Sequence, residues 1–226
     1  MDLGTRYLYD AQDVGGLSSA MIDREKGAAI EGGLHSCWMC RRAVSARALF
    51  CHGCGSVQPV RDLDHFARLG LERRFDIDLA QLNRQYVGFR RLLAPERFAT
   101  RGAREKNHAK AHGDAFSAAY EALKDPIRRA RHLLALEGSG EPVLSERDAD
   151  EIGGWRAELE LAGEGTDIDR IANRVTQERE VTLHRLAGVF RQGELDRAAD
   201  EVARVEALDW LMDQARDRRA SFPAGG

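Results

Sequence analysis

The sequence predicts a mostly α-helical protein with a small four-cysteine knuckle, a helical hairpin and a C-terminal three-helix bundle. Three observations lead to this fold class. Arg, Ala, Leu and Glu are common while β-branched and aromatic residues are sparse, with aromatics at 7% of the chain, which favours helices over sheet. Apolar residues recur at helical spacing in several stretches. All four cysteines lie in one short segment, as two Cys-x-x-Cys pairs.

Length and charge narrow the functional classes. The 226 residues fit one or two domains. The formal net charge of −3 does not call for a nucleic-acid partner or an anionic membrane. No apolar run approaches the length of a membrane span. We expect a cytoplasmic protein, because the N-terminal stretch has no apolar core and carries acidic residues that signal and transit peptides lack: Asp2, Asp10, Asp13, Asp23, Glu25 and Glu31.

The first 36 residues carry little structural signal. They contain the pairs Gly15-Gly16 and Gly32-Gly33 and no clear period of apolar residues. We interpret 1–36 as an extension or linker. The alternative is a segment that becomes ordered when it docks on a partner or on the first domain.

Residues 37–60 predict a metal-binding knuckle. Two Cys-x-x-Cys pairs let four thiolates converge on one tetrahedral ion, and the ligands would be Cys37, Cys40, Cys51 and Cys54. Zn²⁺ is the first choice because it tolerates a closed four-thiolate site, and iron in a rubredoxin-like cage is the alternative. Two disulfides or redox-active pairs are disfavoured in a cytosolic chain without a thioredoxin-like βαβ pattern. A closed site argues against catalysis by the metal.

A helical hairpin is expected within 61–137. Phe66, Leu69 and Gly70 predict a short helix with a glycine stop. Asp78 is an N-cap candidate for the first long helix, whose apolar stripe is Leu79, Leu82, Tyr86, Phe89 and Leu93. Pro95 ends that helix. The second long helix carries Ala109, His112, Phe116, Ala119, Tyr120 and Leu123, and Asp125-Pro126 starts a shorter one.

Basic residues gather along this hairpin. Arg84, Arg90 and Arg91 lie on the first long helix, and Arg97, Arg101, Arg104, Lys106 and Lys110 follow. Such a run is usually a solvated face, and the sharper interpretation is a landing surface for an acidic partner. His108 and His112 have the spacing of a two-His metal site, but without a carboxylate triad nearby we interpret them as surface and half-buried residues.

A C-terminal three-helix bundle is expected over 145–218, after a turn-rich break at 138–142. Ser145 starts the first helix with Asp148 at its third position. Ile152, Trp155 and Leu159 would face inward, and Gly193 makes a corner. Trp210 is either a core residue, which we favour, or a contact to a partner. The two longer helices show stripes at Ile168, Ile171, Val175, Leu183, Leu186, Val189 and Phe190, and at Leu195, Ala198, Val202, Val205, Leu208 and Leu211.

Several features in order resemble a known family. Residues 64–70, the break at 94–98 and residues 118–126 look like a J domain. The continuation 128–138 resembles the HscB co-chaperones of iron–sulfur cluster assembly, and a four-cysteine knuckle before the J domain is similar to eukaryotic and some bacterial members. The resemblance covers about Cys37 to Ala215 and implies two partners, a DnaK-type chaperone and an iron–sulfur scaffold or other protein client.

The chain departs from this family at two sites. J domains stimulate ATP hydrolysis through a His-Pro-Asp tripeptide, and here Ala94-Pro95-Glu96 stands in its place. The resemblance implies a chaperone-binding surface made of Arg84, Arg90, Arg91, Ala94, Pro95, Glu96 and Arg97. Much of the family's Leu/Met/Glu-rich client face is missing at Asp150, Gly153, Gly154 and Ala157, and the client-binding residues we assign are Trp155, Glu206 and Ala207.

We expect a protein that is not an enzyme, because no catalytic constellation emerges. The hypothesis is an HscB-like co-chaperone or adaptor whose ATPase stimulation is weak or lost. The alternative is a non-stimulating structural subunit of another assembly that reuses the fold. A zinc-knuckle nucleic-acid binder using the basic stretch is a third hypothesis, and it requires binding that falls steeply with salt. The client, the oligomeric state and the role of 1–36 are not specified by the sequence.

Overall fold

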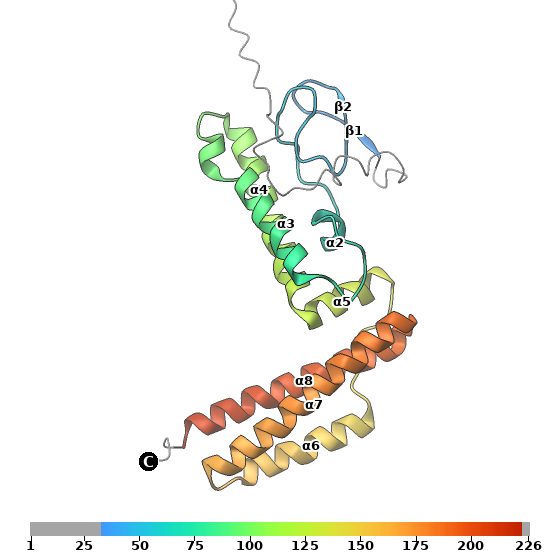
Figure 1. Cartoon of the computed structure of the whole chain (residues 1–226), viewed down its shortest axis with the longest axis vertical. Helices are drawn as coiled ribbons and strands as arrows, with labels where there is room; N and C mark the ends of the chain where they lie inside the picture. The colour runs from blue at the N-terminus through green and yellow to red at the C-terminus, as the bar shows by residue number, and fades with distance from the viewer. Residues whose placement is uncertain (1–32, 223–226) are drawn as a thin grey trace, which may run out of the picture. The chain divides into compact units, whose positions relative to one another are not determined.

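The computed structural model describes residues 33–222, which divide into two compact units. The first consists of 33–72 and 78–121, and the second of 73–77 and 122–222. Figure 1 shows the knuckle and the hairpin of the first unit and the helical bundle of the second. Residues 1–32, most of the predicted extension, lie outside the described part. None of the helices within 33–222 is long and apolar enough to cross a membrane.

The knuckle is built on one small hairpin of two strands. Strand β1 (Leu34–Ser36) pairs antiparallel with β2 (Ala43–Ser45), with His35 opposite Val44. Strand β1 immediately precedes Cys37, so the hairpin turn carries the first Cys-x-x-Cys pair. A single bridge joins Phe50 to Val57 around the second pair.

The predicted helical hairpin is present. A short helix α2 (His65–Arg68) is followed by Gly70 at φ 65°, then by α3 (Leu79–Leu92), the 3-10 turn η2 (Pro95–Phe98) and α4 (Ala103–Lys124). Asp78 caps α3 as predicted, since its side chain accepts from the backbone N–H groups of Ala80 and Gln81. Pro95 takes the first position of η2, where a missing N–H does no harm.

Aromatic stacking holds α3 against α4. Tyr86 stacks on Tyr120 with ring centroids 4.2 Å apart, and Phe89 stacks on Phe116 at 4.0 Å. The Tyr86 hydroxyl also lies 3.2 Å from the Ser117 hydroxyl. Residue numbers rise along α3 as their partners' numbers fall along α4, so the helices are antiparallel. Each such pair contributes about 0.5–1.5 kcal/mol beyond its buried area.

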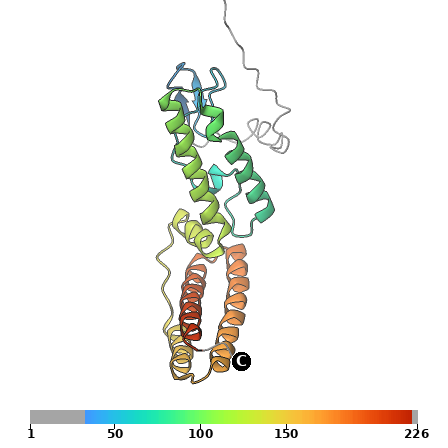
Figure 2. The same ribbon diagram turned by 90° about the vertical axis from the view of Figure 1, so that its left-hand side faces the viewer.

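The second unit contains four helices: α5 (Pro126–Leu136), α6 (Glu146–Leu161), α7 (Gly165–Gln192) and α8 (Leu195–Ala220). The last three form the predicted bundle, and Figure 2 shows them side by side from a second direction. Ser145 accepts from the Asp148 N–H at the start of α6, as predicted. Gly193 ends α7 at φ 74°, a left-handed conformation that suits glycine at a corner.

The segment 73–77 belongs to the second unit because of contacts around Phe75. The Phe75 ring stacks on Phe190 of α7 with ring centroids 5.0 Å apart. The Arg129 guanidinium of α5 also lies 4.9 Å from the centroid of the Phe75 ring. Asp76 pairs with Arg191 at 2.8 Å. These contacts tie the segment before α3 to α5 and α7.

The assignment of Trp210 to the core is wrong. Its side chain is 48% exposed, whereas Leu208 and Leu211 on the same helix are fully buried. At about 100° per residue, Trp210 lies about 200° from Leu208 and therefore points away from the bundle axis. The predicted stripes are otherwise confirmed at the centre of the bundle, where Ile168, Ile171, Val175, Leu186, Val202 and Val205 are buried.

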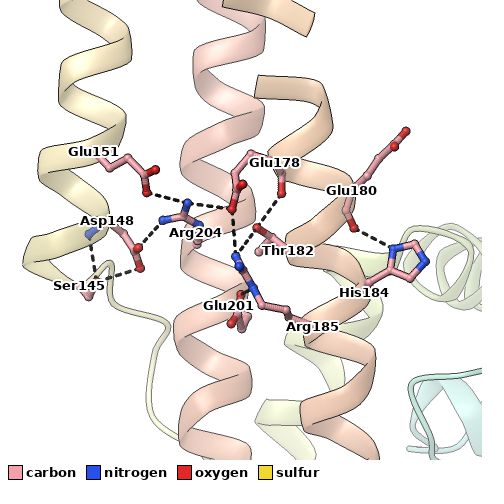
Figure 3. A network of polar contacts seen from close by, with 10 residues as sticks. All are labelled: Ser145, Asp148, Glu151, Glu178, Glu180, Thr182, His184, Arg185, Glu201 and Arg204. Carbon is pink, nitrogen blue, oxygen red and sulfur yellow. Dashed lines mark hydrogen bonds and ion pairs between the residues drawn. The ribbon is translucent and has the colours of Figure 1, made fainter. Parts of the chain in front are cut away.

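A buried arginine at the centre of the bundle had no signal in the apolar pattern. Arg204 of α8 is 6% exposed and donates to carboxylates of two neighbouring helices (Figure 3). It bonds Asp148, Glu151 at 2.8 Å and Glu178 at 3.0 Å. The Glu178 carboxylate also accepts from Arg185 at 3.1 Å. The three helices are thus joined by ionic contacts as well as by apolar packing.

Arg204→Ala is expected to destabilise the bundle by about 3 kcal/mol, because it removes the arginine that pairs with Asp148 and Glu151 and leaves Glu178 with Arg185 alone. Urea unfolding followed by helical circular dichroism measures this loss. The control is Arg170→Ala, which removes an arginine paired with Asp167 at the surface of α7 and should change stability by less than about 0.5 kcal/mol. Equal effects of the two substitutions would contradict a special role for the buried cation.

Candidate functional site

The four cysteine sulfurs converge as the spacing predicts. All four Sγ atoms lie within 4.8 Å of one another. Cys37 and Cys54 are 3.7 Å apart and Cys40 and Cys51 are 3.6 Å apart. A tetrahedron with metal–sulfur bonds of about 2.3 Å has edges of about 3.8 Å, so the cage fits a metal ion of that bond length. Among the described residues, these four cysteines are the one group of three or more Cys, His, Asp or Glu side chains close enough together to hold a metal ion.

Backbone geometry brings the two halves of the cage together. The Met39 N–H points at the Cys37 sulfur and the Gly53 N–H at the Cys51 sulfur, both at 3.4 Å. The residue after each pair is left-handed, with Gly55 at φ 71° and Arg41 at φ 64°. Each Cys-x-x-Cys pair therefore turns tightly around its own sulfur, and Arg41 holds a conformation that glycine adopts at less cost.

The thiols of the cage differ in acidity. Burial raises the pKa of Cys37, but hydrogen bonds from the Cys40 backbone, Ser56, the Met39 backbone and Gln58 outweigh it and lower this pKa to about 5. The pKa of Cys40 is raised to about 11. A hydrogen bond from the Arg42 backbone lowers this pKa, but burial and hydrogen bonds with the other three thiols together raise it by more. A bound cation would favour the thiolate at all four positions.

The two histidines of α4 take structural positions. His112 is 7% exposed and its Nε2 lies 2.9 Å from the Gln58 carbonyl oxygen. Because a carbonyl can only accept, Nε2 carries the proton. Burial lowers the pKa of His112 to about 4, so the ring is neutral at pH 7. His108 is half-buried and its ring lies 5.7 Å from that of Trp38.

The residues Ala94, Pro95 and Glu96 form a compact exposed turn. Ala94 precedes η2 in an extended conformation, with φ −57° and ψ 131°. Phe98 anchors the turn in the core with 6% exposure, while Pro95 and Glu96 are exposed. The Arg97 N–H bonds the Ala94 carbonyl at 3.0 Å, which closes the turn. The shape of the loop is therefore fixed without a histidine.

The arginines assigned to the chaperone-binding surface are exposed, but they do not form one cluster of contacts. Arg84 lies 3.6 Å from the Asp78 carboxylate in a surface pair, which is worth little. Arg90 lies 5.9 Å from the Tyr86 ring. Arg91 and Arg97 are exposed at the end of α3 and in η2. Arg84 and Arg91 share a face because seven residues are two helical turns.

The three residues assigned to client binding are partly engaged inside the second unit. Glu206 pairs with Arg131 of α5 through both carboxylate oxygens, one of them at 2.7 Å. Ala207 and Trp155 pack against the core of the bundle, and Arg174 lies 5.9 Å from the Trp155 ring. Gly153 and Gly154 are exposed on α6.

Several residues that shape the site had no sequence signal. Ser56 and Gln58 support the sulfurs from outside the Cys-x-x-Cys pairs. Glu105 is 4% exposed and accepts from the Val57 N–H at 3.3 Å. In the sequence, Glu105 stands in a charged run that is typical of a solvated face, and only its tertiary partner reveals its role.

A sulfur cage, an antiparallel helical pair around a proline turn and a C-terminal three-helix bundle define the class of protein, a J-type co-chaperone. No model of a protein family matches the sequence. The HscB homologue of Aeromonas hydrophila subsp. hydrophila is 31% identical over 162 residues, which are 67% of this chain and 94% of that protein. The chain belongs to the HscB co-chaperone family.

Further relatives match the chain at 30% identity or less. The HscB homologue of Paraburkholderia phymatum is 30% identical over 157 residues, 64% of this chain and 87% of that protein. The mouse iron–sulfur cluster co-chaperone protein HscB is 26% identical over 189 residues, 80% of this chain and 81% of that protein.

Solved structures have the same fold. The crystal structure of human co-chaperone protein HscB gives a TM-score of 0.76 at 22% identity and covers 82% of this chain and 98% of its own. The structure of the chaperone HscB from Vibrio cholerae gives a TM-score of 0.63 at 25% identity, covering 71% of this chain and 100% of its own.

The buried His112 is expected to make stability fall in acid. Its pKa is lowered from 6.5 to about 4 by burial, so between these values the unfolded chain binds more protons than the folded one. Stability is full above pH 6.5 and is lost as the pH falls toward 4, by about 2 kcal/mol between pH 7 and pH 5. His112→Gln keeps a donor for the Gln58 carbonyl but cannot titrate.

Urea unfolding of the wild type and of His112→Gln, each at pH 7 and pH 5, measures this loss of stability. The wild type should lose about 2 kcal/mol more than His112→Gln over this interval. The comparison removes the pH dependence of the cysteines, which is common to both. An identical loss in both proteins would show that His112 is not held neutral by the fold.

Proposed function

We propose that this chain is a J-type co-chaperone for a DnaK-type chaperone in iron–sulfur protein assembly in the cytoplasm, with weak or absent stimulation of ATP hydrolysis. Membership in the HscB family supports the pathway, since the mouse relative is an iron–sulfur cluster co-chaperone. The fold of the first unit supports the chaperone partner. The proposal that stimulation is weak rests on one observation, the tripeptide Ala94-Pro95-Glu96 at the turn between α3 and α4.

Docking on the chaperone and coupling to its ATP hydrolysis have separate physical requirements in this proposal. Arg84, Arg90, Arg91 and Arg97 supply exposed positive charge, which steers association with an acidic surface. Coupling needs a hydrogen-bond donor at a fixed place, and the Ala94 side chain has none. Glu96 keeps a carboxylate, one methylene farther from the backbone than in aspartate. Docking can therefore persist where the coupling contact is lost.

We assign Zn²⁺ to the sulfur cage. The 3.6–3.7 Å separations between paired sulfurs fit a closed tetrahedral site. With Cys37, Cys40, Cys51 and Cys54 all engaged, the ion would have no open position for a substrate. Its contribution is folding energy for a segment that has two three-residue strands of its own.

An iron–sulfur scaffold or another protein client would contact the bundle. Trp155, Glu206 and Ala207 are the residues we assign to this contact. The pairing of Glu206 with Arg131 favours a second candidate function at this face, because a carboxylate already paired internally has less to offer a client. That candidate is a structural subunit that reuses the fold without stimulating a chaperone.

The double substitution Ala94→His with Glu96→Asp is expected to restore stimulation of the chaperone ATPase. Loss of one positioned hydrogen bond to a charged group costs about 1.5–3 kcal/mol, which corresponds to about a ten- to hundred-fold loss of coupling. Single-turnover ATP hydrolysis by the host's DnaK-type chaperone, with each protein in excess, measures the gain. Arg84→Glu with Arg91→Glu in the restored background should abolish it.

Two results would count against this function. Strong stimulation by the wild type would show that the tripeptide change is tolerated. Absence of both binding and gain in the double mutant would favour the structural subunit.

Metal analysis tests the cage. Purified protein is expected to contain about one zinc per chain, and Cys37→Ser should lose it while the helices of both units remain. Inductively coupled plasma mass spectrometry gives the metal content and circular dichroism the helicity. Iron at the same stoichiometry would replace the zinc assignment, and two disulfides in protein kept reduced and metal-replete would refute a metal site.

A further inference from the structure

The segment 56–58 joins the sulfur cage to the rest of the first unit. On the cage side, the Gln58 side-chain amide donates to the Cys37 sulfur at 3.4 Å. The Ser56 hydroxyl lies 3.4 Å from the Cys37 sulfur and 3.2 Å from that of Cys54. Both side chains are almost fully buried. The position of this segment is therefore tied to the position of the sulfurs.

The same segment bonds α4 through its backbone. The Val57 N–H donates to the Glu105 carboxylate at 3.3 Å, and the Gln58 carbonyl accepts from His112 at 2.9 Å. Glu105 and His112 are seven residues apart, which places them on one face of α4 two turns apart. Two backbone groups that would otherwise be buried without partners are satisfied by one helix face.

Trp38, which lies between the two cysteines of the first Cys-x-x-Cys pair, also contacts the segment 56–58. Its indole N–H donates to the Val57 carbonyl at 2.7 Å. The Arg104 guanidinium lies 4.5 Å from the Trp38 ring, and the His108 ring lies at 5.7 Å. A residue between two metal ligands thus contacts the first two turns of α4.

Glu105 also reaches toward the tripeptide turn. It lies in the first turn of α4, and its carboxylate is 3.9 Å from Arg101 in the connection that follows η2. The Glu105 N–H bonds the Gly102 carbonyl at 3.1 Å, and the Arg101 N–H bonds the Phe98 carbonyl at 2.9 Å. Contacts therefore run without a gap from the sulfurs through Val57 and Glu105 to η2.

We propose that Glu105 is a positioning residue, through which a metal ion in the cage holds the first turns of α4 and the tripeptide turn in place. The role of the turn in this proposal rests on the proposed function, but the coupling of cage and helix does not. By linkage, if the metal stabilises α4, then Glu105 must raise the affinity of the cage for metal. Glu105 would do so without touching a cysteine.

Three variants of the full chain separate this coupling from general damage. Glu105→Leu removes the acceptor and leaves the Val57 N–H buried and unpaired. Glu105→Gln keeps an acceptor oxygen without the charge. Lys106→Ala changes the neighbouring exposed residue and serves as the matched control.

Competition for Zn²⁺ with a chromogenic chelator measures the affinity of the cage. We expect Glu105→Leu to bind Zn²⁺ about fivefold or more weakly than the wild type. Glu105→Gln should lie within about threefold of the wild type, and Lys106→Ala should be unchanged. Trp38→Phe, which keeps a ring but loses the donor to Val57, should weaken binding in the same direction and serves as the test if Glu105→Leu does not fold.

Hydrogen exchange supplies the reciprocal readout. In the wild type, removal of Zn²⁺ by the chelator should speed exchange of the backbone amides of 97–112, and those of α7 should stay the same. In Glu105→Leu, these amides should exchange fast whether or not Zn²⁺ is present.

Two results would overturn the coupling. One is a wild-type affinity for Zn²⁺ in Glu105→Leu, or in Trp38→Phe if Glu105→Leu does not fold. The other is exchange over 97–112 that does not respond to removal of the metal. Neither measurement involves a chaperone, so the coupling can hold when ATPase stimulation fails, and it can fail when stimulation is present.

Discussion

Helix α4 has to satisfy two neighbours at once, and the first unit depends on that constraint. Phe116 and Tyr120 stack on α3, while Glu105 and His112 bond the backbone that follows the last cysteine. The aromatic contacts are non-specific in register, whereas the polar contacts fix it, because a buried N–H or carbonyl needs its partner at one place. The knuckle, whose own buried cluster is built on Cys37, Val44 and Cys51, thereby gains a rigid support.

Buried arginines play the corresponding part in the second unit. Arg204 joins α6, α7 and α8 through three carboxylates, and Arg129 lies over Phe75 and donates to the Leu123 carbonyl at 2.6 Å. Apolar packing alone allows helices to slide or rotate, since many arrangements bury similar area. Charges that must meet their partners inside the bundle restrict those arrangements.

Much of the fold and half of the site could be read from local patterns. The cysteine spacing, the caps at Asp78 and Ser145, the proline turn and the stripes of α7 and α8 each depend on residues close in sequence. Trp210 is exposed although the core was the favoured prediction, because its position on α8 points away from the bundle axis. The buried positions of Glu105 and Arg204 were not predicted, because a charged residue in a helix looks solvated unless its distant partner is known.

The sequence by itself determined the helices, their ends, the convergence of the four cysteines and the Ala94-Pro95-Glu96 tripeptide of the turn. These follow from backbone propensity, periodicity and the chemistry of single side chains. Only the tertiary structure decided that Ser56 and Gln58 support the cage, that Glu105 and His112 hold the knuckle, and that Glu206 is paired with Arg131. Such contacts join residues 19 to 75 positions apart, and no local pattern encodes a hydrogen bond between groups that meet only after the chain has folded.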